Sequence, residues 1–278
     1  MHDKYPHLFS PIRIGGLVIK NRIEASPIAI PNDSPEFASM ENMVSYELRA
    51  RSGAGLVVHE EMAVSKLADN GSGPTFADTA LALQDIMKES EAVHRYGAIS
   101  SVSLTHHGGW NTLSVAPDGK LYAPSAFKNP YGIMTTEMTE DIMFELIEAY
   151  ARAAEMAQYG GHDMVQIHGA HGWLLSQFMS PLYNHRTDKY GGSLENRARF
   201  PLMIVDAIRK RCPKLPIEYR FSANDFMEGG FGPEEGIEFA KMLDGKVDLI
   251  HITSSSFFDP TCGKLFPSMF TERGVNIP

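Results

Sequence analysis

The order of apolar segments constrains the fold of this chain more than any other feature. Short apolar runs that end in polar residues alternate with longer stretches of helical periodicity, at a repeat of roughly 40 residues. This alternation predicts a parallel sheet wound into an α/β barrel and argues against a sandwich or a helical bundle. The strands that we expect cover residues 22–26, 56–59, 98–104, 163–167, 216–221 and 247–252.

The segments between these runs carry helix boundary signals. Thr139 is a good N-cap before the acidic first turn Glu140-Asp141, and Gly160-Gly161 stops the same helix. The alternation of Ile12 to Lys20 around Gly15-Gly16 predicts a hairpin that plugs the bottom of the barrel. A loop rich in proline and glycine is expected to shape the pocket. Three other expected helices span 39–51, 79–96 and 193–211, and a fourth begins near 233. The loop spans 108–136.

Composition sets the class of protein. With 278 residues, 43% of them hydrophobic, the chain can bury a large core, so we expect one domain over residues 1–278. The net charge of −9 is spread along the chain, which argues against nucleic-acid or membrane partners. Cys212 and Cys262 show no metal or disulfide spacing, and the N-terminus lacks a signal-like apolar core. These features predict a cytoplasmic protein without a metal site.

Polar side chains gather after the fourth expected strand. His168 and His171 lie where this strand gives way to its loop, and a dense polar run that includes Arg186 and Asp188 follows. The carboxyl ends of barrel strands carry the active site in this architecture. We therefore expect the two histidines in the site, and Arg186 with Asp188 as a buried structural pair.

Four stretches resemble the Old Yellow Enzyme family of NADH:flavin oxidoreductases, in the expected order. HGAHGWLLSQFMSPLYNHRTDKYGGSLENRARF, which runs from His168 to Phe200, is a long match without gaps. The resemblance implies an eight-stranded TIM barrel, (β/α)8, that binds FMN and takes hydride from NADH or NADPH. The other stretches are LFSPIRIGGLVIKNRI at 8–23, GAGLVVHEEMAVS at 53–65 and EYRFSANDFMEGG at 218–230.

The resemblance also assigns cofactor-binding residues. Pro27, Ile28 and Ala29 fall where the family's first strand passes the flavin edge, and Glu61 falls where the second strand offers it backbone groups. Arg220 matches an arginine whose fixed positive charge would stabilise the anionic reduced cofactor.

The catalytic pair implied by the resemblance is His168 and His171, which would hold the oxygen of the substrate through two N–H donors. Ser103 stands on the third strand where the family has a glutamine facing the flavin, and Gly109 stands where an arginine is common. Trp173 replaces the tyrosine that often donates the proton, and its indole N–H has no useful acidity. We expect Trp173 to form a wall of the substrate pocket.

The resemblance favours an ene-reductase that reduces an activated C=C bond of a small molecule. Within the flavin hypothesis the alternative is an amine dehydrogenase or demethylase, and an inactive fragment is a further alternative. A metal-dependent hydrolase that uses His168, His171 and His251 is a less favoured reading. His106 and His107 fit a structural role that braces the loop better than a catalytic one.

The last expectation concerns barrel closure. Only six strands can be found, and Gly274 to Pro278 resembles the approach to a seventh unit. A barrel of this type binds the cofactor phosphate with loops after strands seven and eight. We therefore expect the N-terminal part of a longer, multidomain or oligomeric protein that alone binds FMN weakly or not at all.

Overall fold

A six-stranded parallel sheet forms the centre of the computed structural model, which describes residues 4–28, 40–65, 80–110 and 118–256. Its strands lie in the order β10–β9–β8–β5–β4–β3, so each successive strand is added on the same side of the previous one. This winding is that of a barrel and differs from a doubly wound sheet. The strands are β3 (Glu24–Ala25), β4 (Leu56–Ala63), β5 (Ile99–Thr105), β8 (Met164–Gly169), β9 (Ile217–Ser222) and β10 (Leu249–Thr253).

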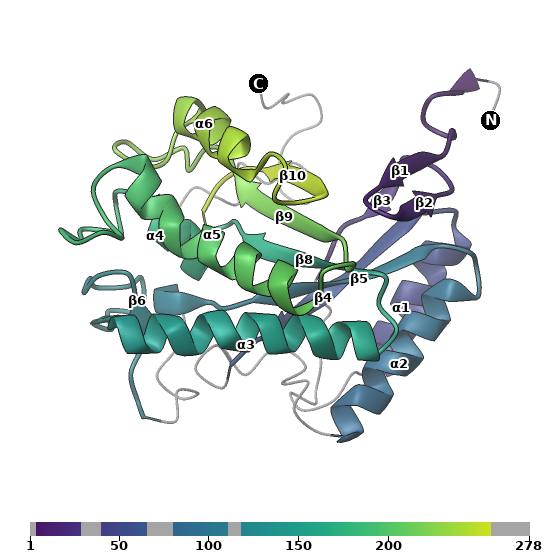
Figure 1. The fold of residues 1–278 in the computed structure, drawn as a ribbon, viewed down its shortest axis with the longest axis horizontal. Coiled ribbons are helices and arrows are strands. Elements are labelled where there is room, and N and C mark those ends of the chain that lie inside the picture. The colour runs from purple at the N-terminus through teal and green to yellow at the C-terminus, as the bar shows by residue number, and fades with distance from the viewer. Residues whose placement is uncertain (1–3, 29–39, 66–79, 111–117, 257–278) are drawn as a thin grey trace.

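Helices connect the strands and cover the outside of the sheet (Figure 1). The side chain of Thr139 accepts a hydrogen bond from the backbone of Ile142, and Ser193 caps its helix in the same way, so both predicted starts are confirmed. In Figure 1, α3 and α5 run side by side, and α1 packs against α2. The helices are α1 (Met40–Arg51), α2 (Ala80–His94), α3 (Glu140–Tyr159), α5 (Leu194–Arg211) and α6 (Pro233–Leu243).

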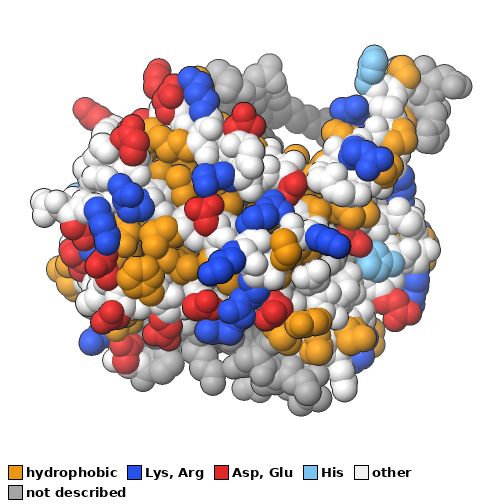
Figure 2. All heavy atoms as spheres, in the orientation of Figure 1, with side chains coloured by type: hydrophobic (Ala, Val, Ile, Leu, Met, Phe, Trp, Pro, Cys, Tyr) orange, Lys and Arg blue, Asp and Glu red, His pale blue; other side chains and the backbone are white. Residues whose placement is uncertain are grey.

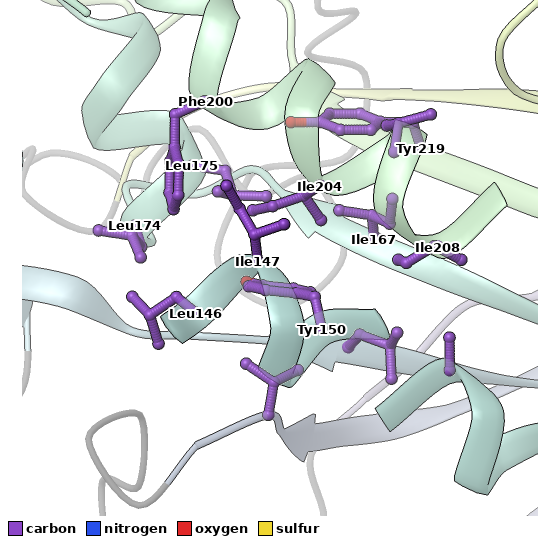
Figure 3. Close-up of a cluster of buried hydrophobic side chains, with 14 of the residues drawn as sticks. Leu146, Ile147, Tyr150, Ile167, Leu174, Leu175, Phe200, Ile204, Ile208 and Tyr219 are labelled. Carbon is purple, nitrogen blue, oxygen red and sulfur yellow. The ribbon is translucent and has the colours of Figure 1, made fainter. Parts of the chain in front are cut away.

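The main core lies between α3, α5 and the strands β8 and β9 (Figure 3). Its members are fully or almost fully buried, and each large apolar side chain contributes about 1.5–3 kcal/mol when it leaves water. Residues three and four apart share a helix face, and Leu146 and Tyr150 place one face of α3 in this core. The labelled side chains are Leu146, Ile147, Tyr150, Ile167, Leu174, Leu175, Phe200, Ile204, Ile208 and Tyr219.

The predicted N-terminal hairpin is present as β1 (Ile12–Ile14) and β2 (Leu17–Ile19). Gly15 adopts φ 53° in its two-residue turn, a backbone conformation that favours glycine. Side chains of both strands pack on Leu56 and Met164, which are the first residues of β4 and β8. The hairpin therefore covers the amino ends of the strands, as the sequence predicted.

The sequence missed one helix and part of the long loop. Helix α4 (Leu174–Met179) is buried on all sides, so it has no polar face that would reveal helical periodicity. The segment expected to be irregular contains a short helix, η2 (Gly108–Trp110), and two short paired strands, β6 (Tyr122–Ala123) and β7 (Thr136–Glu137).

Acidic and basic side chains intermingle on the face that Figure 2 shows, which agrees with a net charge spread along the sequence. Among the helices that the structure describes, none has the length and apolar character needed to cross a membrane.

Candidate active site

A bulge in β4 decides where its two glutamates point. His59 pairs with Val102 and Glu61 pairs with Ser103, so Glu60 is the extra residue. Such a bulge re-aims the side chains next to it. Glu60 accepts a hydrogen bond from Asn42 of α1, on the outside of the sheet, whereas Glu61 reaches the carboxyl ends of β5 and β8. The sequence suggested that this strand ends at residue 59, because polar residues follow.

Three ring nitrogens approach the carboxylate of Glu61. Its Oε2 lies 2.7 Å from Nε2 of His107, and its Oε1 lies 2.8 Å from Nε1 of Trp173 and 3.3 Å from Nε2 of His168. Burial raises the pKa of Glu61, but the charge of His107 and the hydrogen bonds from His107 and His168 outweigh it, so the pKa lies well below its usual value. Glu61 is therefore a carboxylate at neutral pH.

His168 and His171 lie together, as the sequence predicted. Nε2 of His168 is 3.4 Å from Nδ1 of His171, and both side chains are buried. His171 has φ 61°, and its backbone N–H donates to the hydroxyl of Ser222, which holds this unusual conformation.

Burial lowers the pKa of His168, and it lowers that of His171 still further with help from the neighbouring charges of His168 and Arg220. Both imidazoles are therefore neutral at pH 7. A neutral imidazole donates one N–H, so the pair suits stabilisation of a developing oxyanion better than proton transfer. Their catalytic role stays a prediction.

Arg220 of β9 lies directly beside His168 in the sheet register. Its Nε is buried and has no hydrogen-bond partner among the described residues. An unpaired guanidinium N–H in the interior needs an acceptor. The pyrimidine side of a flavin, with its ring nitrogen and carbonyl oxygen, is an acceptor of the kind that the resemblance implies here.

Ser103 is hydrogen-bonded to a polar side chain of the neighbouring strand. Its hydroxyl donates to Oε1 of Gln166 at 3.1 Å, and Nε2 of Gln166 donates to Glu218 at 2.8 Å. Gln166 is a candidate site residue that sequence reasoning missed. The only available signal was a polar residue in an otherwise apolar strand.

Pro27 and Ile28 follow β3 at the edge of the sheet, and Ala29 lies outside the described residues. Ile28 leaves 64% of its surface exposed, so an apolar surface is available where the resemblance implies the flavin edge. Together with the unpaired Arg220, this exposed apolar side chain fits FMN.

An arginine at Gly109, which is common in the family, would require neighbouring side chains to move. A Cβ at this position would lie 2.8 Å from ring atom Cζ of Phe127 and 2.8 Å from a methyl group of Thr135. The packing of the long loop therefore explains this departure.

The two histidines of the third strand end have different surroundings. Nδ1 of His106 accepts a hydrogen bond from the backbone of Gly108, and burial lowers the pKa of His106 to about 3. His106 thus braces the loop, as expected. His107 instead pairs with Glu61, which the sequence did not indicate.

The expected pair forms, but only Arg186 is buried, because the side chain of Asp188 is 43% exposed. Arg186 and Asp188 form an ion pair, with Nη2 and Oδ2 2.5 Å apart. The same guanidinium donates to the backbone carbonyls of Pro124 and Met138, so it fastens the long loop to the segment before α3.

Two clusters of described residues could hold a metal ion, and neither contains His168 or His171. His251, which the hydrolase reading grouped with those two, instead bridges Glu24 at 3.0 Å and Glu218 at 2.9 Å. Burial lowers the pKa of His251, but the two carboxylates raise it to about 9. A protonated His251 is a poor metal ligand. His251, Glu24 and Glu218 are one of the two clusters. The other consists of the buried side chains of His59, Glu89 and His162.

A barrel sheet with paired neutral donors and a buried arginine at its carboxyl end fits a flavin-dependent oxidoreductase. The sequence profile of the NADH:flavin oxidoreductase / NADH oxidase family matches residues 7–261, and the chain belongs to that family. FMN and NADH or NADPH are the cofactors of this class, as the sequence predicted.

Relatives of known sequence agree. The chain is 36% identical to an NADH oxidase of Thermoanaerobacter brockii over 98% of its own length and 42% of the relative's. It is 34% identical to an NADPH dehydrogenase of Bacillus subtilis over 90% of its own length and 73% of the relative's. It is 32% identical to a cinnamate reductase of Clostridium sporogenes over 100% of its own length and 45% of the relative's. The chain thus spans less than half of two of these relatives.

Solved structures show the same barrel. A 2-naphthoyl-CoA reductase complex superposes with a TM-score of 0.84 at 28% identity, covering 92% of this chain and 42% of that chain. An old yellow enzyme homologue from Zymomonas mobilis superposes with a TM-score of 0.81 at 26% identity, covering 94% of this chain and 79% of that chain. A histamine dehydrogenase from Rhizobium sp. 4-9 superposes with a TM-score of 0.81 at 25% identity, covering 91% of this chain and 38% of that chain.

Proposed function

We propose that this chain is the FMN-binding barrel of an oxidoreductase that takes hydride from NADH or NADPH and reduces an activated C=C bond. The substrate class is an α,β-unsaturated carbonyl or a related small molecule. The observation that carries the proposal is the pair of buried, neutral imidazoles of His168 and His171 beside Arg220. Relatives named cinnamate reductase and NADPH dehydrogenase support it.

Each residue would have a distinct role. Bound FMN would supply the hydride chemistry, passing hydride from the nicotinamide to the substrate. Arg220 would bind its pyrimidine side, and Pro27, Ile28 and the backbone of Glu61 would flank it. His168 and His171 would donate N–H groups to the activating oxygen of the substrate. Removal of one such donor costs about 2.7–4 kcal/mol of transition-state stabilisation.

Single substitutions of the two histidines test the proposal. In His168→Ala and His171→Ala, with FMN supplied in excess, we expect alkene reduction to slow by about 10²–10³-fold and a phenolate ligand to bind more weakly. Flavin reduction by the nicotinamide should change much less. His185→Ala is a matched control, because His185 is an exposed histidine on the loop that follows α4. Unchanged alkene rates in both variants would rule out the assignment.

Amine dehydrogenation is the second candidate, and the structural similarity to histamine dehydrogenase favours it. A substrate amine would reduce the flavin in the absence of nicotinamide, whereas an alkene would reoxidise it. The stopped-flow traces of the two half-reactions therefore distinguish the candidates.

We also propose a cytoplasmic location and a small-molecule substrate without nucleic-acid or membrane partners. The scattered charge of −9 and the two cysteines without framework spacing support this proposal. Assembly into an oligomer or a longer chain is compatible with it. Cell fractionation with a specific antibody tests the location.

A further inference from the structure

Reduction of a C=C bond needs a proton as well as a hydride, so this inference rests on the proposed function. Trp173 stands where the resemblance places a donor tyrosine, and an indole N–H is a hydrogen-bond donor without useful acidity. In the structure this N–H is directed to Oε1 of Glu61 at 2.8 Å. The proton therefore comes from a source other than Trp173, either water or another side chain at the mouth of the barrel.

We propose that Glu61 and His107 together supply this proton to the substrate carbon. Oε2 of Glu61 and Nε2 of His107 are 2.7 Å apart, a distance typical of a short hydrogen bond with charged character. The Glu61 side chain is 28% exposed and the His107 side chain is 4% exposed. The carboxyl group is therefore partly open to solvent, whereas the imidazole is almost fully buried.

The position of Glu61 relative to the histidine pair fits proton delivery. Its Oε1 lies 3.3 Å from Nε2 of His168, one of the two groups that would hold the substrate oxygen. In an unsaturated carbonyl compound the α carbon is only two bonds from that oxygen. A substrate held by His168 and His171 would bring its α carbon near the carboxyl group of Glu61, which is the placement that a general acid needs.

The proton and electron balance is simple. Hydride adds to the β carbon, and the π electrons move toward the oxygen held by His168 and His171. Nε2 of His107 gives its proton to Oε2 of the Glu61 carboxylate, and the carboxylic acid formed in this way gives that proton to the α carbon. The carboxylate is unchanged overall, and the neutral His107 recovers a proton from water.

Trp173 acts as a positioning residue for this pair. Its N–H fixes Oε1 of Glu61, which leaves Oε2 directed at His107. Its ring also meets the His107 ring edge to face, with centroids 4.5 Å apart and an interplanar angle of 85°. Both contacts restrict the carboxylate to one orientation.

The test compares Glu61→Gln and His107→Gln with the wild-type chain, each with FMN in excess. Glu91→Gln is the control, because this glutamate is exposed on α2. Reoxidation is followed with an activated alkene and with a quinone, whose oxygen atoms take protons directly from water. We expect both variants to lose about 10²–10⁴-fold with the alkene and to stay within about 3-fold of wild type with the quinone.

A second readout is independent of turnover. In the ¹⁵N NMR spectrum of flavin-free protein at neutral pH, we expect both ring nitrogens of His107 to carry protons in the wild type. Glu61→Gln should shift His107 toward the neutral imidazole. Trp173→Phe should weaken the pairing less than Glu61→Gln does, because the carboxylate remains.

The outcomes separate the two proposals. A wild-type protein that reduces no activated alkene would contradict the proposed function. Wild-type alkene reduction that both variants retain would overturn the proton assignment alone. Equal losses with alkene and quinone would also overturn it, because they would reveal a structural role. If one variant does not fold, the other still decides between these outcomes.

Discussion

An ion-paired histidine inside the barrel allows a sharp prediction of pH-dependent stability. His251 of β10 contacts Glu24 of β3 and Glu218 of β9, so a single imidazole joins the two edge strands of the described sheet. We predict that His251→Gln weakens the fold, because glutamine removes the positive charge that pairs with Glu24 and Glu218. Such a loss is expected to cost about 2 kcal/mol at neutral pH, below the 3–5 kcal/mol typical of fully buried pairs.

The magnitude follows from the pKa of His251, which the two carboxylates raise from 6.5 to about 9 against the effect of burial. At 1.36 kcal/mol per pKa unit this rise corresponds to about 3 kcal/mol, and partial exposure reduces it to about 2. The folded protein holds this proton more tightly than the unfolded chain. The stabilisation is therefore complete below about pH 6.5 and is lost as the pH rises through about 9.

Urea denaturation of both proteins at about pH 6 and about pH 9.5 measures the effect. The wild type should lose about 2 kcal/mol more than His251→Gln between these pH values, because titrating groups away from this cluster contribute equally to both. His185→Gln, at an exposed position, should follow the wild type. Parallel pH profiles for His251→Gln and the wild type would refute the reasoning.

Further predictions concern packing and the long loop. Gly160→Ala should destabilise the fold by about 1–3 kcal/mol in chemical denaturation, because its Cβ would overlap the side chain of Ile86. Gly109→Arg should lower the melting temperature and leave FMN affinity no higher than wild type in a fluorescence titration, because Phe127 fills that space. Asp188→Asn should cost about 1–3 kcal/mol in thermal unfolding, because the pairing partner of Arg186 loses its charge.

The barrel could be predicted from sequence because its signals are local. Each strand is a short apolar run, and Thr139 and Ser193 cap their helices through contacts three residues away. Helix α4 could not be predicted, because all six of its residues are buried and its sequence has no periodic polar face.

The candidate site was only partly predictable for a related reason. His168 and His171 are neighbours in sequence, so their pairing could be expected. Glu61, His107 and Trp173 come from three separate segments and meet only when β4, β5 and β8 lie side by side. The β4 bulge that turns Glu61 inward depends on strand pairing, which the sequence does not show.

The most direct test of the account is an anaerobic titration of the purified chain, supplied with excess FMN and followed by visible absorption. The account predicts that NADH or NADPH bleaches the flavin band and that an activated alkene from a panel of enones, enoates and nitroalkenes restores it. A flavin that stays oxidised in excess of both nicotinamides, or that no alkene in the panel reoxidises, would contradict it.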